Sequence, residues 1–183
     1  MQIQEKKKIY TYSDYAKLEE GAPYQLIEGE LIISPAPRII HQRIIARLYR
    51  LLDDYVEKNK IGEIFLSPVD VYFSDLNTFQ PDLVFVSKEK SNIVGEMKIE
   101  GAPDLVIEVL SPEHAYYDLK TKKHIYEKYK VKEYWLVDPI ESTIEVFTLA
   151  GEKFQLFSKM TVKDSIKSNL LKEFKVKTSE VFN

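Results

Sequence analysis

The sequence predicts an α/β fold, in which helices pack on a β-sheet, with a β-hairpin near the N-terminus. Three observations support this prediction. The segment Gly101–Pro139 has the order strand, helix, strand, which makes the two strands parallel neighbours joined by a right-handed crossover. Apolar residues recur at helical spacing from Arg38 to Lys58. Paired short strands are indicated at 24–34 and 142–157.

The N-terminal region is expected to hold an arm, a short helix and the hairpin. Residues 1–10 are polar and basic and are predicted to form a flexible arm, with the rest of a single domain extending to residue 183. A short helix is expected over Thr11–Gly21, capped by Ser13. The segment Tyr24–Ser34 has two apolar runs that turn at Glu28-Gly29-Glu30, which is typical of a hairpin.

Two strands are expected in the middle of the chain, over residues 61–66 and 69–73, followed by a loop over 74–80. A third strand is expected over 81–86, and the polar segment 87–100 is expected to be partly helical. The third strand begins with Asp82. After Pro139, a hairpin is expected around Ala150-Gly151. The apolar tail residues are predicted to form another strand or edge; they are Leu170, Leu171, Phe174 and Val176.

Alternation along the strand after Pro103 separates two kinds of side chain. Leu105, Ile107 and Val109 share one face, while Asp104 and Glu108 share the other. A strand with carboxylates on one face and apolar residues on the other is expected to bury the apolar face and to present Glu108 to the helix that follows. The second strand of this unit is expected over 133–138.

The helix of this unit carries an unusual lysine. At about 100° per residue, Lys122 falls in the middle of an apolar stripe, with Asp118 at its edge. The stripe consists of Leu119, Ile125, Tyr126 and Tyr129. A lysine directed inward is costly unless it is paired or functional. We therefore expect Lys122 to point toward the sheet and toward Glu108.

Composition limits the classes of protein that the chain can belong to. The chain has 183 residues, enough for one domain with a core, and 12 Tyr and 9 Phe, as in a globular protein. It has no cysteine, which excludes disulfides and cysteine metal sites. No apolar stretch is long enough to span a membrane and the N-terminus lacks a signal-peptide core, so a cytoplasmic protein is expected. The net charge of −3 is not that of a general nucleic-acid binder.

Asp82, Glu108 and Lys122 are the candidate catalytic residues. Two carboxylates from neighbouring strands can bind a hard cation such as Mg²⁺, and a nearby lysine can hold a water nucleophile or stabilise developing charge. The alternative is an ordinary helix ion pair between Lys122 and Asp118. Asp104 shares the face of Glu108 but lies about 13 Å away along the strand at ~3.3 Å per residue, so Asp82 is the preferred second ligand.

Other common catalytic motifs are absent from the sequence. His41, His114 and His124 have no metal-binding spacing. His124 is expected on the polar side of its helix, whereas His41, near the start of the long helix, is expected to face either a cleft or water. The six glycines are scattered, which excludes a glycine-rich phosphate loop, and there is no GxSxG motif.

The order of these motifs resembles the Uma2 family, also catalogued as domain of unknown function 820. The resemblance covers residues 11–176. It rests on Tyr24-Gln-Leu-Ile-Glu-Gly-Glu-Leu31, Ser34-Pro35-Ala-Pro37 with His41, Pro81-Asp82, Pro103-Asp104-Leu-Val-Ile-Glu108-Val-Leu-Ser-Pro112, Asp118 with Lys122 and Tyr126, and Glu133-Tyr-Trp-Leu-Val-Asp138-Pro139.

The resemblance implies a restriction-endonuclease-like core of the PD-(D/E)XK nuclease superfamily. Its implications are a central mixed β-sheet flanked by helices, Mg²⁺ (with Mn²⁺ as a substitute) and phosphodiester hydrolysis. The superfamily places a lysine two residues after the acidic residue on the same strand. Here Leu110 follows Glu108 and Val109 at that position, and Lys122 on the following helix matches the displaced lysine.

The sequence therefore predicts a Mg²⁺-dependent endonuclease acting on DNA, with Asp82 and Glu108 as metal ligands and Lys122 as the third catalytic residue. A homodimer would suit the two strands of duplex DNA. Two alternatives stay open. One is a catalytically inactive module of the same fold that binds nucleic acid or a protein. The other is a metal-dependent phosphodiesterase acting on small phosphates, which suits the acidic charge balance better.

Overall fold

The structure is a computed structural model that describes residues 8–19, 21–34, 36–111 and 117–183, without the side chains of 117–119. Within these ranges, a larger sheet has the order β11-β10-β9-β8-β6-β3. Its strands are β3 (Gly62–Leu66), β6 (Leu83–Ser87), β8 (Leu105–Val109), β9 (Glu133–Asp138), β10 (Thr143–Ala150) and β11 (Lys153–Met160).

This sheet is mixed. Strands β8 and β9 run parallel, as the strand–helix–strand order predicts, whereas the other neighbouring strands are antiparallel. The alternation predicted for β8 is also confirmed. Leu105, Ile107 and Val109 pack into one apolar cluster, while Val106 packs into a second cluster on the opposite face.

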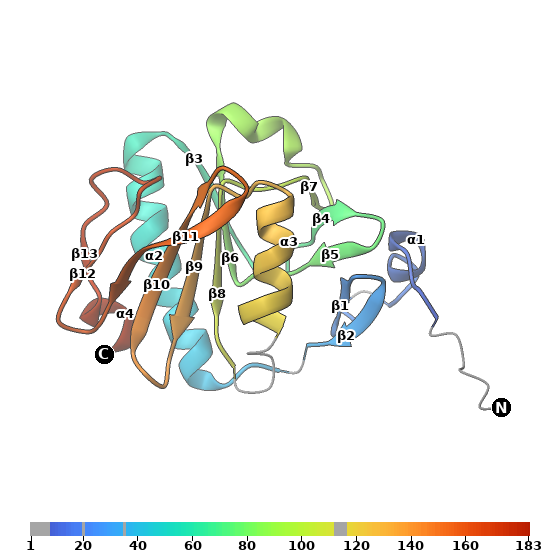
Figure 1. Ribbon diagram of the computed structural model, residues 1–183, viewed down its shortest axis with the longest axis horizontal. Helices are drawn as coiled ribbons and strands as arrows, with labels where there is room; N and C mark the ends of the chain where they lie inside the picture. Colours follow the sequence, from blue (N-terminus) through green and yellow to red (C-terminus); the bar gives the residue numbers. More distant parts are fainter. Residues whose placement is uncertain (1–7, 20, 35, 112–116) are drawn as a thin grey trace.

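Helices cover both faces of the larger sheet (Figure 1). The long helix α2 (Ile39–Asn59) packs on one face together with the C-terminal tail, and their shared core includes Leu48, Trp135 and Phe174. On the other face lie the π-helical segment η2 (Tyr117–Lys122) and helix α3 (Lys123–Lys128) that continues it. The sheet between two helical layers confirms the predicted α/β architecture.

A smaller sheet lies beyond α3 (Figure 1) and has the order β2-β1-β5-β4-β7. Its strands are β1 (Tyr24–Ile27), β2 (Glu30–Ile33), β4 (Val71–Ser74), β5 (Asn77–Phe79) and β7 (Ile99–Glu100). The predicted N-terminal hairpin is present as β1–β2, and its turn places Glu28 and Gly29 at positive φ of 49° and 79°. The predicted loop 74–80 is wrong in part, because β5 forms there and pairs with both β1 and β4.

The two ends of the chain correct the sequence interpretation. Helix α1 (Tyr12–Tyr15) begins after Thr11, whose N–H and hydroxyl both donate to the Asp14 carboxylate at 3.0 Å, so Thr11 and not Ser13 is the cap. Of the arm predicted over 1–10, residues 1–7 lie outside the described ranges.

The tail is not a single strand. It forms short β12 and β13 and a terminal helix; these are β12 (Ser165–Ile166), β13 (Val176–Lys177) and α4 (Ser179–Phe182). The polar excursion is partly helical, as predicted, with a 3₁₀ segment η1 (Lys88–Ile93). In the part of the chain that the structure describes, we find no helix with the length and apolar character needed to cross a membrane.

Candidate active site

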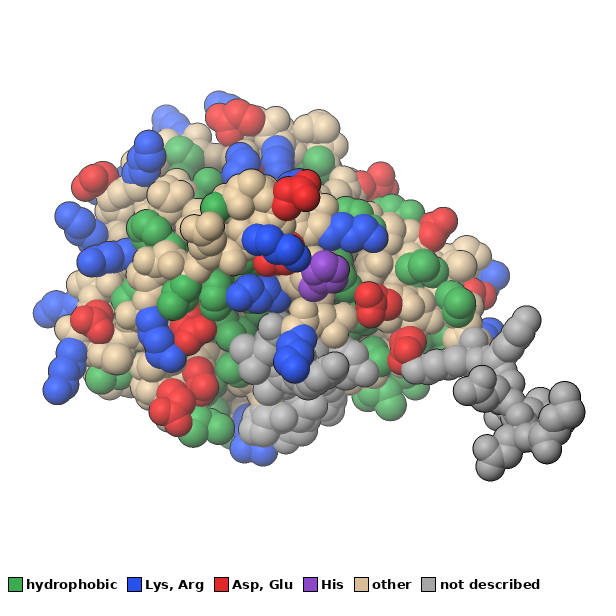
Figure 2. Space-filling model, in the orientation of Figure 1, with side chains coloured by type: hydrophobic (Ala, Val, Ile, Leu, Met, Phe, Trp, Pro, Cys, Tyr) green, Lys and Arg blue, Asp and Glu red, His purple; other side chains and the backbone are tan. Residues whose placement is uncertain are grey.

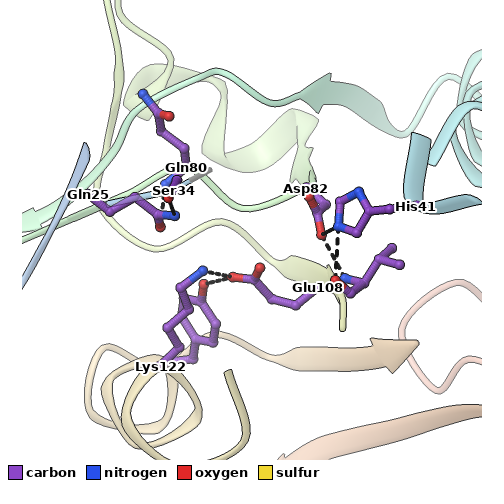
Figure 3. A network of polar contacts seen from close by, with 9 residues as sticks. Gln25, Ser34, His41, Gln80, Asp82, Glu108 and Lys122 are labelled. Carbon is purple, nitrogen blue, oxygen red and sulfur yellow. Dashed lines mark hydrogen bonds and ion pairs between the residues drawn. The ribbon is translucent and has the colours of Figure 1, made fainter. Parts of the chain in front are cut away.

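A cavity of ≈ 720 Å³ opens where the β1–β2 hairpin, the start of α2 and the larger sheet meet. All three candidate catalytic residues, Asp82, Glu108 and Lys122, line it. They come from three separate segments: the residue before β6, the strand β8 and the last residue of η2. Figure 3 shows them around one space. The fold therefore brings together the residues that the sequence could only place on separate elements.

Asp82 lies beside Glu108 because of the register between β6 and β8. These strands are antiparallel and pair Leu83 with Ile107, so residues 82 and 108 fall at the next position along the ladder. The Asp82 Oδ2 atom accepts a hydrogen bond from the backbone N–H of Val109 at 2.7 Å. This bond fixes the carboxylate at the end of β8, where it is available to the cavity.

Glu108, Lys122 and Tyr126 form a buried polar cluster. The Lys122 ammonium donates to Glu108 Oε1 at 2.9 Å, and the Tyr126 hydroxyl donates to the same oxygen at 2.5 Å. Lys122 and Glu108 are almost fully buried. The lysine thus points inward as the helical spacing predicts. The rival pairing of Lys122 with Asp118 involves a side chain outside the described residues and is not tested.

His41 enters the site from the first turn of α2. Its Nε2 atom lies 3.0 Å from the Val109 carbonyl oxygen and 3.3 Å from Asp82 Oδ2. Burial acts to lower the pKa of His41, but the hydrogen bond and negative charge of Asp82, helped by the Val109 carbonyl, raise it above its ordinary value overall. Of the two surroundings that the sequence left open for His41, the structure shows the cleft.

Asp104 and His124 lie outside the site. Asp104 is fully buried near the start of β8, where its Oδ2 accepts from the Ser87 N–H at 2.9 Å and its Oδ1 lies 2.7 Å from the Lys132 ammonium. Asp104 therefore connects the start of β8 to Ser87 and Lys132 and takes no part in the cavity. His124 is 63% exposed, as predicted, and His114 lies outside the described residues.

A second polar group lines the cavity opposite His41 (Figure 3), and the sequence did not indicate it. Gln25 Nε2 donates to Ser34 Oγ at 2.6 Å, and the backbone N–H of Gln80 donates to Gln25 Oε1 at 3.2 Å. The one available signal was a polar residue between apolar neighbours in β1. That pattern is equally typical of a half-exposed strand, so it identifies no site by itself.

The donor atoms of the site suit a hard divalent cation. Carboxylates of Asp82 and Glu108 and the carbonyl of Val109 supply oxygen, the ligand type that Mg²⁺ prefers. No group of three or more His, Asp or Glu side chains gathers in a metal-binding arrangement among the residues placed by the structure. A cation held here would therefore keep several waters, which is usual for Mg²⁺.

A family model, a curated relative and a solved structure match this chain. A model of the Uma2 family, described as "Putative restriction endonuclease", matches residues 11–177. The protein named "Uncharacterized protein sll1609", from Synechocystis sp. (strain ATCC 27184 / PCC 6803 / Kazusa), is 27% identical over 157 residues, which cover 84% of this chain and 88% of the relative.

A solved structure shows the same fold. It is the crystal structure of a protein described as a putative nuclease belonging to DUF820, from Anabaena variabilis ATCC 29413. It superposes with a TM-score of 0.78, is 23% identical in sequence, and covers 94% of this chain and 97% of its own. The fold predicted from the sequence, a central mixed sheet flanked by helices, is thereby confirmed.

Proposed function

The chain belongs to the Uma2 family, whose model is described as "Putative restriction endonuclease", and from that premise we propose that it is a metal-dependent endonuclease that hydrolyses phosphodiester bonds in DNA. Membership supports a nuclease function. The observation that carries the proposal is the convergence of Asp82, Glu108 and Lys122 on one cavity. Two carboxylates beside a buried lysine suit phosphoryl transfer, in which negative charge develops on the phosphate oxygens.

Each of the three residues has a proposed role. Asp82 and Glu108 hold the cation, Mg²⁺ or Mn²⁺, through carboxylate oxygens. When bound, that cation would activate a water and neutralise charge on the phosphoryl group. The Lys122 ammonium, fixed by Glu108, orients the attacking water or stabilises the charge that develops on the phosphate. Tyr126 donates a second hydrogen bond to the same carboxylate oxygen and helps to fix it.

The surface charge bears on how DNA would bind. Figure 2 shows Lys and Arg side chains interspersed with Asp and Glu on the face that carries α3, so this face has no patch of a single sign. The cationic side chains of Arg38 and Lys122 line the cavity together with Asp82 and Glu108, whose negative charge a bound cation would offset. We infer that phosphate contacts concentrate at the cavity. Cleavage of both strands of a duplex would then require a homodimer or two successive events.

Metal binding and nicking, measured on matched variants, test the proposal. Calorimetry with Mg²⁺ and Mn²⁺ is followed by nicking of supercoiled plasmid, using wild type, Glu108→Gln and Glu145→Gln. Glu145 is a strand carboxylate paired with Lys159 at 2.7 Å, so its variant makes the same chemical change outside the cavity. We expect Glu108→Gln to lose binding and nicking together and Glu145→Gln to keep both. Wild-type protein that binds no divalent cation would overturn the proposal.

One observation favours a second candidate function. A cavity of ≈ 720 Å³ is the size of a small-molecule pocket, which also suits a phosphodiesterase that acts on nucleotides or other small phosphate esters. Rates on bis(p-nitrophenyl) phosphate and on plasmid DNA separate the two. Turnover of the small ester with intact plasmid would favour the phosphodiesterase. DNA binding without either activity would indicate an inactive binding module.

A further inference from the structure

We propose that Gln25 and Ser34 form a recognition site for phosphate oxygens of the nucleic-acid substrate, facing the carboxylates across the cavity. This inference rests on the proposed function, because it assigns the substrate contact of the same cavity. It adds two residues that neither the sequence pattern nor the nuclease chemistry assigns.

The first step is the orientation of the Gln25 amide. The backbone N–H of Gln80 can only donate, so the Gln25 atom that it contacts at 3.2 Å must be the carbonyl oxygen Oε1. The NH₂ group of Gln25 therefore lies at the other position, 2.6 Å from Ser34 Oγ. The structure leaves this amide a single hydrogen-bonding orientation.

The second step is the role of the Ser34 hydroxyl as hydrogen-bond donor or acceptor. Because the Gln25 amide donates to Ser34 Oγ, the hydroxyl acts as acceptor in that bond, and its own hydrogen is left to donate elsewhere. The amide NH₂ has a second hydrogen as well. Both groups line the cavity. The Gln25–Ser34 pair thus presents hydrogen-bond donors, while each of its two oxygens already accepts one hydrogen bond within the protein.

The third step is the support behind the pair. Gln25 is only 9% exposed and lies in β1, and Ser34 directly follows β2, so the hairpin fixes both. The side chain of Gln80 holds its own backbone in place by donating to Asp70 Oδ1 at 3.0 Å, away from the Gln25 amide (Figure 3). Groups held in this way lose little entropy when they bind a ligand.

The chemistry of the ligand follows from these donors and from the charges around them. Two neutral donors in a cavity that is also lined by the cationic side chain of Arg38 suit an anionic acceptor, and the charge of Lys122 is balanced by Glu108. In a nucleic acid, that acceptor is a non-bridging phosphate oxygen. The carboxylates and the cation that they would hold lie across the cavity, so one phosphate can be held from both sides, or two neighbouring phosphates can be held by one side each.

Equilibrium binding of a fluorescent DNA duplex, measured by anisotropy in Ca²⁺, tests the site. The variants are Ser34→Ala, which removes one donor, and Gln25→Glu, which keeps the acceptor for the Gln80 N–H but replaces the donors by a negative charge. The control is Gln155→Glu, the same change on the exposed surface of β11. We expect the Kd to rise about tenfold for Ser34→Ala and at least tenfold for Gln25→Glu, and to stay within about twofold for Gln155→Glu.

The outcomes separate this inference from the proposed function. If Gln25→Glu and Ser34→Ala bind DNA as the control does, or if wild type does not bind it, the recognition site is wrong, whatever the wild-type nicking rate. If both variants lose binding while wild type nicks no DNA, the recognition site stands and the endonuclease proposal fails. A circular dichroism spectrum matching wild type is required of each variant, and Ser34→Ala decides the result if Gln25→Glu does not fold.

Discussion

The Lys122 ammonium lies 2.9 Å from the Glu108 carboxylate although the two residues belong to different elements, the helical segment η2 and strand β8. Both side chains are almost fully buried, so each charge compensates the other where water cannot. Removing one partner leaves the other buried and unbalanced. The pair is therefore the point at which stability and the proposed chemistry are most closely linked.

Lys122→Met is expected to abolish plasmid nicking but to preserve metal binding. The substitution keeps most of the length of the side chain and removes its charge, so the cation no longer competes with Lys122 for the Glu108 carboxylate. Without metal, we expect the free energy of unfolding to fall by about 3 kcal/mol, because a buried carboxylate loses its counter-charge. Added Mg²⁺ would recover part of this loss. Urea unfolding with and without Mg²⁺, calorimetry and a nicking assay give the three readouts.

Lys128→Met is the control, since Lys128 is an exposed lysine at the end of α3. It should nick plasmid and unfold as wild type does. Nicking by Lys122→Met at the wild-type rate would remove Lys122 from the proposed catalytic set. Loss of metal binding in that variant would instead show that the lysine is needed to shape the carboxylate site.

Tyr126→Phe removes the second hydrogen bond to Glu108 and keeps the ring that packs against Tyr134 and Phe79. We expect a loss of about 1 kcal/mol in the free energy of unfolding, measured in urea. Nicking should fall less than tenfold, because Lys122 still holds the carboxylate. Tyr129→Phe, whose ring packs against Phe73, serves as the control. Equal free energies of unfolding for the two variants would show that the hydrogen bond from the Tyr126 hydroxyl to Glu108 does not stabilise the fold.

The inward direction of Lys122 was predictable because its spacing to Tyr126 is a single helical turn. The segment up to Lys122 is π-helical, with a wider turn than the helical wheel assumes, but α3 begins at the next residue. From Lys122 onward the ordinary spacing holds. The strand β8 was equally readable, since alternation separates Glu108 from Ile107 whatever the strand pairs with.

The position of Asp82 beside Glu108 could not be read from the sequence, because it depends on the register between β6 and β8. The Gln25–Ser34 pair is even less predictable from the sequence. Its orientation is set by a backbone N–H at Gln80, on a segment distant in sequence, next to β5. Strand β5 has only three residues, Asn-Thr-Phe, which show no clear alternation and so do not predict a strand. Contacts between distant segments decide such positions, and local patterns do not contain them.

His41 gives a pH dependence that can be tested without metal. Its pKa is raised in the folded protein, because the effects of Asp82 and the Val109 carbonyl outweigh that of burial, so its interactions stabilise the fold fully below the ordinary unfolded value of about 6.5. This contribution is lost as the pH rises through the raised pKa. The stability difference between wild type and His41→Gln should therefore be largest near pH 5.5, at about 1 kcal/mol, and should shrink toward pH 9.

Urea unfolding in EDTA at several pH values measures that difference. His124→Gln, at a histidine that is 63% exposed, is the control and should show a small difference at every pH. A His41→Gln difference that is constant or grows with pH would contradict a folded-state pKa above the ordinary value. It would indicate that neutral His41 is the form that the cavity stabilises.

Glu133 is expected to stabilise the fold and to have no role in catalysis. It is fully buried, and its Oε1 accepts from Trp135 Nε1 at 2.7 Å and from Ser168 Oγ at 2.6 Å. Its Oε2 accepts from the backbone N–H groups of Asn169 and Leu170 at 2.8 and 3.0 Å. Four donors converge on this one carboxylate, which anchors the C-terminal tail to β9.

Glu133→Gln should lower the free energy of unfolding by about 3 kcal/mol, because an NH₂ group would face donors where an acceptor is needed. Urea unfolding measures the loss, with Glu145→Gln, a more exposed carboxylate paired with Lys159, as a control expected to change stability by at most about 0.5 kcal/mol. Limited proteolysis should cut the tail of Glu133→Gln first. Because Glu133 does not line the cavity, nicking by the folded fraction should match wild type. A stable variant with a protected tail would show that the apolar contacts of Leu171 and Phe174 hold the tail without the carboxylate.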